Sequence, residues 1–125
     1  MSRSEAIKSM GQEPNSFKKT PLSQHPTDSY YEAGFQIFYA GDEPLVDEIE
    51  LSRDCGFTST IKGTNILDLP VKLALEELEL ATGTKPVTED NGYSYEIEEL
   101  GIWLWRSSNE NEDESFFQTI GIRKI

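Results

Sequence analysis

One stretch decides the fold of this 125-residue chain: Pro70 to Gly83, which reads PVKLALEELELATG. Its apolar residues recur at spacings of three and four, which predicts an amphipathic helix over residues 70–82. A proline in the first turn and a glycine directly after the last turn are residues that such helix ends favour. The stripe that we expect to face a sheet consists of Val71, Ala74, Leu75, Leu78 and Thr82.

The same helix carries a second apolar stripe on its other side, made of Leu69, Leu73 and Leu80. A surface helix normally has one apolar side, so the second stripe needs a cover. We expect that cover to be the N-terminal segment, whose scattered apolar residues have no other partner. A binding surface for another protein is the alternative.

Short alternating apolar runs flank the helix on both sides, as is typical of strands. Before the helix we expect strands at residues 35–39, 46–51 and 57–62, and after it at 93–97, 102–105 and 116–122. The order βββαβββ predicts an α+β fold, with one antiparallel sheet of about six strands and the main helix packed on it. The sequence shows no internal repeat.

Residues 1–29 differ in composition from the rest of the chain. They are polar, contain three of the six prolines and have few apolar residues. Such a segment buries too little apolar surface to order itself. We therefore expect a loosely ordered N-terminal arm at residues 1–29, followed by a single α+β domain at residues 30–125.

Charge is the strongest signal in the composition. The formal net charge is −12, and residues 28–125 hold 21 of the 23 acidic residues but only 7 of the 11 basic ones. Direct binding to nucleic acid is disfavoured, because a phosphate backbone requires a positive surface. A basic protein is the partner that this charge suits best.

The N-terminus lacks the apolar run of a signal peptide, and no stretch approaches the roughly 20 apolar residues that a membrane helix needs. The single Cys55 cannot form an internal disulfide. We therefore expect a cytoplasmic protein that makes no contact with a membrane.

No catalytic constellation is evident, so we expect a binding protein and not an enzyme, without a cofactor. His25 is the only histidine and lies in the arm, where nothing fixes its geometry. Cys55 has no partner base nearby. Two acidic clusters are candidates for a metal site. One consists of Asp42, Glu43 and Asp47, and the other is the loop at residues 109–114. Neither has the spacing of a calcium loop, so no metal site is predicted.

Acidic residues on the outward side of the predicted strands are the first candidates for binding. In residues 46–51, alternation turns Ile49 and Leu51 inward and leaves carboxylates outward. Further acids follow at residues 96–99, beyond the main helix. The predicted acidic binding residues are Asp47, Glu48, Glu50, Glu96, Glu98 and Glu99.

Two tryptophans are the second candidates. Alternation puts Trp103 and Trp105 on one face of the strand at residues 102–105, opposite Ile102 and Leu104. Tryptophan is enriched at interface hot spots, so both indoles are predicted anchors for a partner. The interpretation that we favour, however, is that both rings belong to the core, beneath the arm or the helix.

Four segments resemble a group of small bacterial proteins: residues 34–39, 46–53, 102–106 and 116–122, the third of which reads IWLWR. Some of these proteins are similar to immunity proteins of polymorphic toxin and contact-dependent growth inhibition systems. The resemblance covers roughly residues 30–123 and consists of strand and Trp-Arg patterns, without a catalytic signature. It implies that the chain binds and neutralises a cognate toxin in the producing cell.

The leading hypothesis is therefore an immunity protein that binds a cationic toxin domain, with a nuclease as the first class to consider. An enzyme that holds nucleic acid must be basic, and an inhibitor can occupy the same surface with carboxylates. Two alternatives stay open. One is an acidic regulatory module that binds another basic host protein, and the other is a small hydrolase that uses paired carboxylates.

Overall fold

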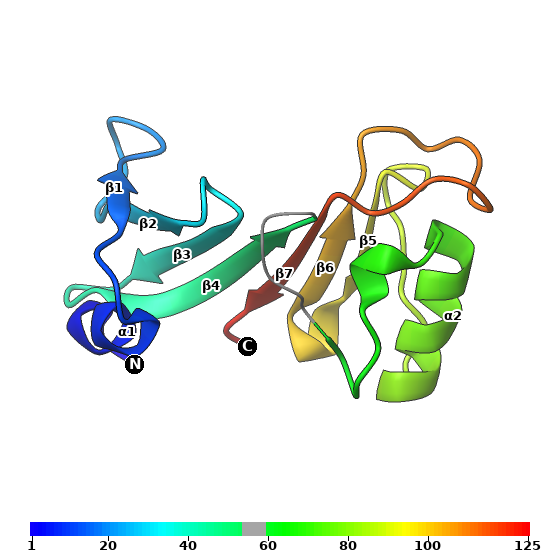
Figure 1. Ribbon diagram of the computed structural model, residues 1–125, viewed down its shortest axis with the longest axis horizontal. Helices are drawn as coiled ribbons and strands as arrows, with labels where there is room; N and C mark the ends of the chain where they lie inside the picture. Colours follow the sequence, from blue (N-terminus) through cyan, green and yellow to red (C-terminus); the bar gives the residue numbers. More distant parts are fainter. Residues whose placement is uncertain (54–59) are drawn as a thin grey trace.

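The computed structural model describes residues 1–53 and 60–125, which form one seven-stranded antiparallel sheet with two α-helices (Figure 1). The helices are α1 (Arg3–Met10) and α2 (Val71–Thr82), and the strands are β1 (Asn15–Phe17), β2 (Thr27–Tyr30), β3 (Phe35–Ala40), β4 (Leu45–Ser52), β5 (Ser94–Ile97), β6 (Ile102–Trp105) and β7 (Thr119–Arg123). Two short 3-10 helices, η1 (Ile66–Asp68) and η2 (Glu98–Leu100), precede α2 and join β5 to β6. The predicted α+β class and single antiparallel sheet are confirmed, with seven strands in place of about six.

The predicted main helix is α2. It ends at Gly83, whose φ of 73° lies in the left-handed region and whose N–H donates to the carbonyl of Glu79. Val71, Ala74 and Leu78 are fully buried on its inner side. The apolar spacing in the sequence therefore identified the side of α2 that packs on the sheet.

The second apolar stripe of α2 is not covered by the N-terminal segment. Leu73 is 48% exposed and Leu80 is 78% exposed. The N-terminal helix α1 lies at the opposite end of the molecule from α2 (Figure 1). The expected cover is therefore wrong, because the N-terminal residues join the far end of the sheet instead.

The segment predicted as a loosely ordered arm is ordered and contributes α1, β1 and β2. Ser2 begins α1 with a capping box: its hydroxyl accepts from the N–H of Glu5, and the Glu5 carboxylate accepts from the N–H of Ser2. β1 then pairs with β2, and β2 pairs with β3. Because polar residues dominate both strands, the apolar pattern gave no sign of them.

The strand predicted at residues 57–62 lies partly outside the described residues, as does Cys55. Within the described part, Ile61 forms an isolated bridge with Thr64 in a turn. The two strands that the prediction lacked, β1 and β2, lie at the N-terminal end of the sheet.

The strand order β1-β2-β3-β4-β7-β6-β5 divides the molecule into two halves of the same plan. Residues 1–53 form a helix followed by a meander that leads inward to β4. Residues 60–125 form a helix, a bridge from Val87 to β5, and a meander that leads inward to β7. The two final strands pair antiparallel at the centre of the sheet (Figure 1). Each half thus has a helix followed by a meander, with four strands in the first half and three in the second.

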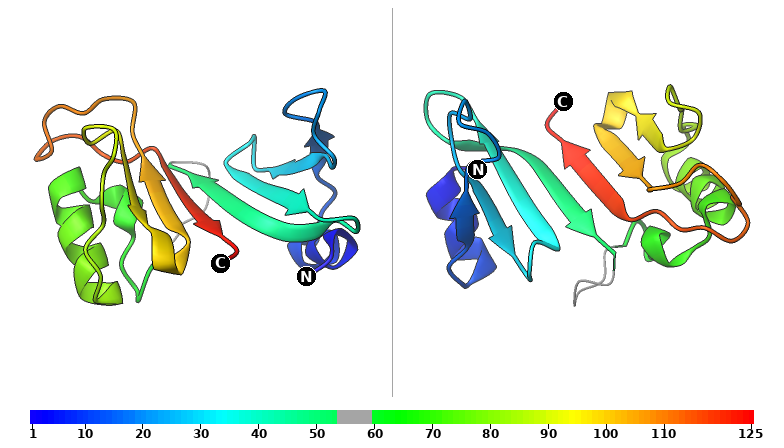
Figure 2. Two further views of the ribbon diagram at one scale, coloured as in Figure 1. Left: turned by 180° about the vertical axis from the view of Figure 1, so that it is seen from behind. Right: turned by 90° about the horizontal axis from the view of Figure 1, so that it is seen from above.

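Both helices cover the same face of the sheet. Residues that are paired across neighbouring strands point to the same side, and the pairs Ile37 with Ile49, Ile49 with Ile122, and Ile122 with Ile102 run across the centre. Ala6 of α1 packs at one end of this face, with Tyr30, Ile37 and Tyr39. Val71, Ala74 and Leu78 of α2 pack at the other end, with Tyr95, Ile97, Leu104 and Ile120. The two helices therefore lie at opposite ends of the molecule, on a twisted sheet (Figure 2).

Neither helix is long and apolar enough to cross a membrane, and the same holds for every other helical segment among the described residues.

Candidate functional site

The sheet face opposite the two helices carries no helix in the described part of the chain, and we call it the open face. Five of the eight predicted binding residues lie on it. They are Glu48 and Glu50 of β4, Glu96 of β5, and Trp103 and Trp105 of β6, and the face also carries Phe38, Thr119 and Arg123. One row runs straight across four strands, from Glu50 through Gly121 and Trp103 to Glu96. The fold therefore brings acids from both halves of the chain to the sides of one indole.

The two indoles differ in how firmly they are held. A Cβ atom on Gly121 would lie 1.9 Å from Cε2 of Trp103, so the indole occupies the space that a side chain at position 121 would fill. The indole Nε1–H of Trp103 donates to Oε1 of Glu48 at 2.6 Å. Trp105 is 43% exposed. The interpretation that both indoles are core is therefore wrong for Trp105, while Trp103 is partly buried against the sheet itself.

Glu50 carries the least compensated charge on the open face. Its burial raises the pKa of its carboxyl and outweighs the positive charge of Lys19, which lowers the pKa, while the neighbouring charge of Glu48 adds a smaller upward shift. Glu50 makes no hydrogen bond or ion pair with any described residue. A cation from a partner molecule would therefore relieve an unfavourable ionisation at this position.

Among the described residues, two cations lie on or beside the open face: Arg123 on the central strand β7, and Lys19 near β3. Nη2 of Arg123 is 3.0 Å from Oε1 of Glu96, and both side chains are half-exposed to solvent. Nζ of Lys19 lies 4.3 Å from the centre of the Phe38 ring. Exposed pairs of this kind are worth little in water, so a partner can exchange with them at small cost.

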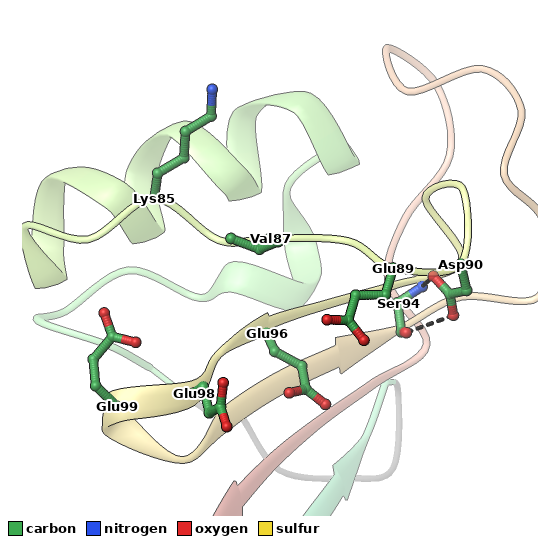
Figure 3. A pocket seen from close by; sticks show the side chains of 8 residues that line it. All are labelled: Lys85, Val87, Glu89, Asp90, Ser94, Glu96, Glu98 and Glu99. Carbon is green, nitrogen blue, oxygen red and sulfur yellow. Dashed lines mark hydrogen bonds between the residues drawn. The ribbon is translucent and has the colours of Figure 1, made fainter.

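A shallow cavity of about 420 Å³ adjoins the open face along the outer side of β5 (Figure 3). Its lining consists of Lys85, Val87, Glu89, Asp90, Ser94, Glu96, Glu98 and Glu99. Lys85 extends away from the carboxylates (Figure 3). Because Glu96 belongs to both the open face and this cavity, the two form one continuous negative area that includes the predicted residues Glu98 and Glu99.

One carboxylate of the cavity has a structural role. Asp90 accepts hydrogen bonds from the N–H and the hydroxyl of Ser94, at 2.8 Å and 2.6 Å (Figure 3). It also accepts one from the hydroxyl of Thr88. These bonds, led by those from Ser94, lower the pKa of Asp90. Asp90 therefore fixes the turn before β5. Of the glutamates in the cavity, Glu96 is paired with Arg123, whereas the side chains of Glu89, Glu98 and Glu99 make no hydrogen bond or ion pair with a described residue.

Asp47 stands apart from the other predicted residues. A register shift between Phe38 and Tyr39 leaves it opposite no residue of β3. Its carbonyl accepts from the N–H of Lys124 at 2.7 Å, and its side chain is exposed. Asp47 thus lies at a β-bulge and does not extend the row of acids on the open face.

Arg106, the arginine of the Trp-Arg pattern, lies on the side of the sheet that the helices cover. It is buried, and its guanidinium donates to the carbonyls of Gly92 and Glu110 and to the hydroxyl of Ser115. It therefore holds the loops between the strands of the second half together. It takes no part in the open face.

The residues considered for catalysis or metal binding make structural contacts instead. Nε2 of His25 lies 2.6 Å from the carbonyl oxygen of Gly41, which fastens the β1–β2 loop to the β3–β4 turn. The buried carboxylate of Asp28 is already engaged by Arg3, Ser16 and Tyr39. Over residues 1–53 and 60–125, no group of three or more His, Cys, Asp or Glu side chains could hold a metal ion. The arrangement is suited to charge recognition, because its acids are surface groups beside aromatic rings.

Several contributors to the surface were not predicted. Gly121 carried a signal, since an isolated glycine within the strand pattern IGI marks a close approach of another group. No sequence signal pointed to Glu89 or Arg123, because the position of Glu89 depends on the bridge from Val87 to β5 and that of Arg123 on the pairing of β7.

Comparisons with known protein families, with curated proteins and with solved structures find no match to this chain.

Proposed function

We propose that this chain is an immunity protein that binds a basic toxin domain, with a nuclease as the first class to test, and that it does so through the open face and the adjoining acidic cavity. One observation carries the proposal: the sheet face left uncovered by the helices gathers Glu48, Glu50 and Glu96 around two indoles. Indoles supply contact area at low entropic cost, and carboxylates match the cations of a surface built to hold nucleic acid.

The electrostatics support a partner that is strongly basic. With a net charge of −12, the chain attracts cationic proteins over distances comparable to the Debye length and accelerates their encounter. The pKa of Glu50 is raised, mainly by burial and further by Glu48, so a cation that binds beside it stabilises its ionised form and adds favourable binding free energy. The acids would thus contribute to both the rate of association and the stability of the complex.

The test is co-expression with the toxin encoded next to the gene for this chain. The wild-type chain protects the cells, and the double variant Glu50→Gln/Glu96→Gln protects them less because two charges of the open face are lost. The matched control is Glu76→Gln/Glu79→Gln, which removes two exposed acids from α2, and it should protect like the wild type. Association measured with purified proteins should slow as the salt concentration rises.

Two outcomes would count against the proposal. If the chain protects against no neighbouring toxin, the immunity function is lost, and binding to a basic host protein would then favour the regulatory module. If both double variants weaken protection equally, the open face is not the binding surface.

A further inference from the structure

The indole of Trp103 is a fixed platform. One side of the ring lies on the backbone of Gly121, and its Nε1–H is held by the carboxylate of Glu48 at 2.6 Å. β7 lies between the strands that carry Trp103 and Glu48, so this bond spans three strands. A ring held in this way loses little conformational entropy when a ligand group settles on it.

Carboxylates border this platform on both sides. Glu50 follows Gly121 in the cross-strand row on the β4 side, and Glu96 is the cross-strand partner of Trp103 on the β5 side. Glu50 has no hydrogen bond or ion pair with a described residue. The surface therefore offers an aromatic plane with negative groups at its edges.

The chain's own cations act on the bordering carboxylates but not on the ring itself. Arg123 pairs with Glu96, a half-exposed pair with which an incoming guanidinium can exchange, and Lys19 lies over Phe38, from where its charge opposes the raised pKa of Glu50. Among the described residues, no cation lies over the ring of Trp103 or Trp105. Each of these two contacts uses one group of the face: the ammonium of Lys19 lies against a ring, and the guanidinium of Arg123 lies against a carboxylate.

An aromatic plane edged by carboxylates distinguishes between the two basic side chains. The guanidinium of arginine is planar, stacks on a ring and can donate two parallel hydrogen bonds to a carboxylate. The ammonium of lysine is a strongly hydrated point charge and cannot do both. We propose that the open face is a docking surface for arginine side chains of the partner, which lie on Trp103 between Glu50 and Glu96 and are preferred over lysine. This inference deepens the proposed function and rests on it for the basic nature of the partner.

The test uses oligo-arginine and oligo-lysine peptides of equal length with the full chain. Trp103 and Trp105 are the only two tryptophans, so intrinsic fluorescence reports on the open face directly. We expect the arginine peptide to change the emission and to bind roughly two- to fivefold more tightly than the lysine peptide, as one exposed cation–π contact allows. The variant Trp105→Phe should retain the change, and Trp103→Phe should lose most of it.

Charge variants complete the design. Glu50→Gln should weaken the arginine peptide more than Glu76→Gln, which removes an exposed acid of α2 away from the open face. Equal affinity for the two peptides, or equal weakening by both variants, would overturn the inference, since attraction would then be unspecific. Circular dichroism of each variant establishes that the fold is retained.

The two proposals can fail separately. Arginine selectivity without protection from any toxin would leave the docking surface and remove the immunity function. Protection that depends on Glu50 and Glu96, but with no preference for arginine, would leave the immunity function and overturn the arginine preference.

Discussion

The two halves of the molecule share one plan but are held together by different interactions. The second half buries ten residues in one apolar cluster beneath the twelve-residue helix α2. The first half buries four, Ala6, Tyr30, Ile37 and Tyr39, beneath the eight-residue α1. The smaller apolar core is supplemented by a buried polar network around Asp28, so the same arrangement of elements can be stabilised in two ways.

The network in the first half centres on a carboxylate with no exposed surface. Nε and Nη2 of Arg3 each donate to Asp28 at 2.9 Å, the hydroxyl of Ser16 donates at 2.7 Å, and that of Tyr39 at 2.8 Å. These bonds link α1, β1, β2 and β3. A buried charge with all its partners in place is tolerated, but the removal of one member leaves the others unpaired. We therefore expect the first half to be the more fragile of the two.

The largest expected effect tests this difference directly. Asp28→Ala should lower the free energy of unfolding by about 3–5 kcal/mol, because Arg3 and Tyr39 lose their buried acceptor. Leu78→Ala should cost about 2–5 kcal/mol through a cavity beneath α2. Hydrogen exchange should show loss of protection in β1–β3 for the first variant and around α2 for the second. Identical patterns would mean that the halves unfold as one unit.

Acid should affect the first half before the second. Burial alone would raise the pKa of Asp28, but the hydrogen bonds from Arg3, Ser16 and Tyr39 outweigh it and lower the pKa. The network therefore stabilises the fold above the ordinary Asp range and is lost as the pH falls below about 4 toward the lowered pKa. Denaturation of wild type and Asp28→Asn between neutral and acid pH checks this, since the variant should lose less stability. Asp90→Asn is the control, because Asp90 has a lowered pKa but is exposed.

A smaller effect is expected where the halves join. Gly121→Ala forces the Trp103 indole off β7 and away from Glu48, which should cost about 1–3 kcal/mol. The double variant Gly121→Ala/Trp103→Phe should recover part of this loss, because a smaller ring leaves room for the methyl group. Denaturation midpoints and the tryptophan emission report both changes. Additive losses in the double variant would contradict the contact.

The corresponding turns of the two halves differ in strain. Tyr31, Glu32 and Ala33 all have positive φ in the β2–β3 turn, whereas the β5–β6 turn meets this need with Gly101. Ala33→Gly should therefore raise the free energy of unfolding by about 1 kcal/mol. Gly101→Ala should lower it, since the new Cβ would lie 2.3 Å from the carbonyl oxygen of Arg123. Thermal unfolding of both variants gives the signs, and a loss for Ala33→Gly would show that the turn is not strained.

The smallest effect has the opposite sign for stability and for binding. Because burial and Glu48 raise the pKa of Glu50, its ionised form is disfavoured in the fold, and this loss of stability grows as the pH rises through the raised pKa. Glu50→Gln should slightly raise the melting temperature at neutral pH. It should have no effect at acid pH, where Glu50 is protonated in both the folded and the unfolded chain. The same variant should weaken peptide binding. A lower melting temperature at neutral pH would show that the charge of Glu50 stabilises the free protein.

Local patterns predicted a large part of the fold. The spacing of Val71, Ala74 and Leu78 identified α2 and its buried side, and alternation put Trp103 and Trp105 on one face. The outward glutamates of β4 were identified in the same way. β1 and β2 were missed because residues such as Asn15, Ser29 and Asp28 carry no apolar alternation, and their order depends on hydrogen bonds to distant partners.

The sequence by itself determined the class of the fold, its main helix, its charge and the side of each apolar strand on which the acids and indoles lie, because these depend on the three- to four-residue period of a helix and the two-residue period of a strand. The tertiary structure alone decided which strands are neighbours. The bond from Trp103 to Glu48 joins residues 55 positions apart, and it exists because β4 and β7 pair at the centre of the sheet. Such pairings are selected by the packing of the whole chain, so no local pattern contains them.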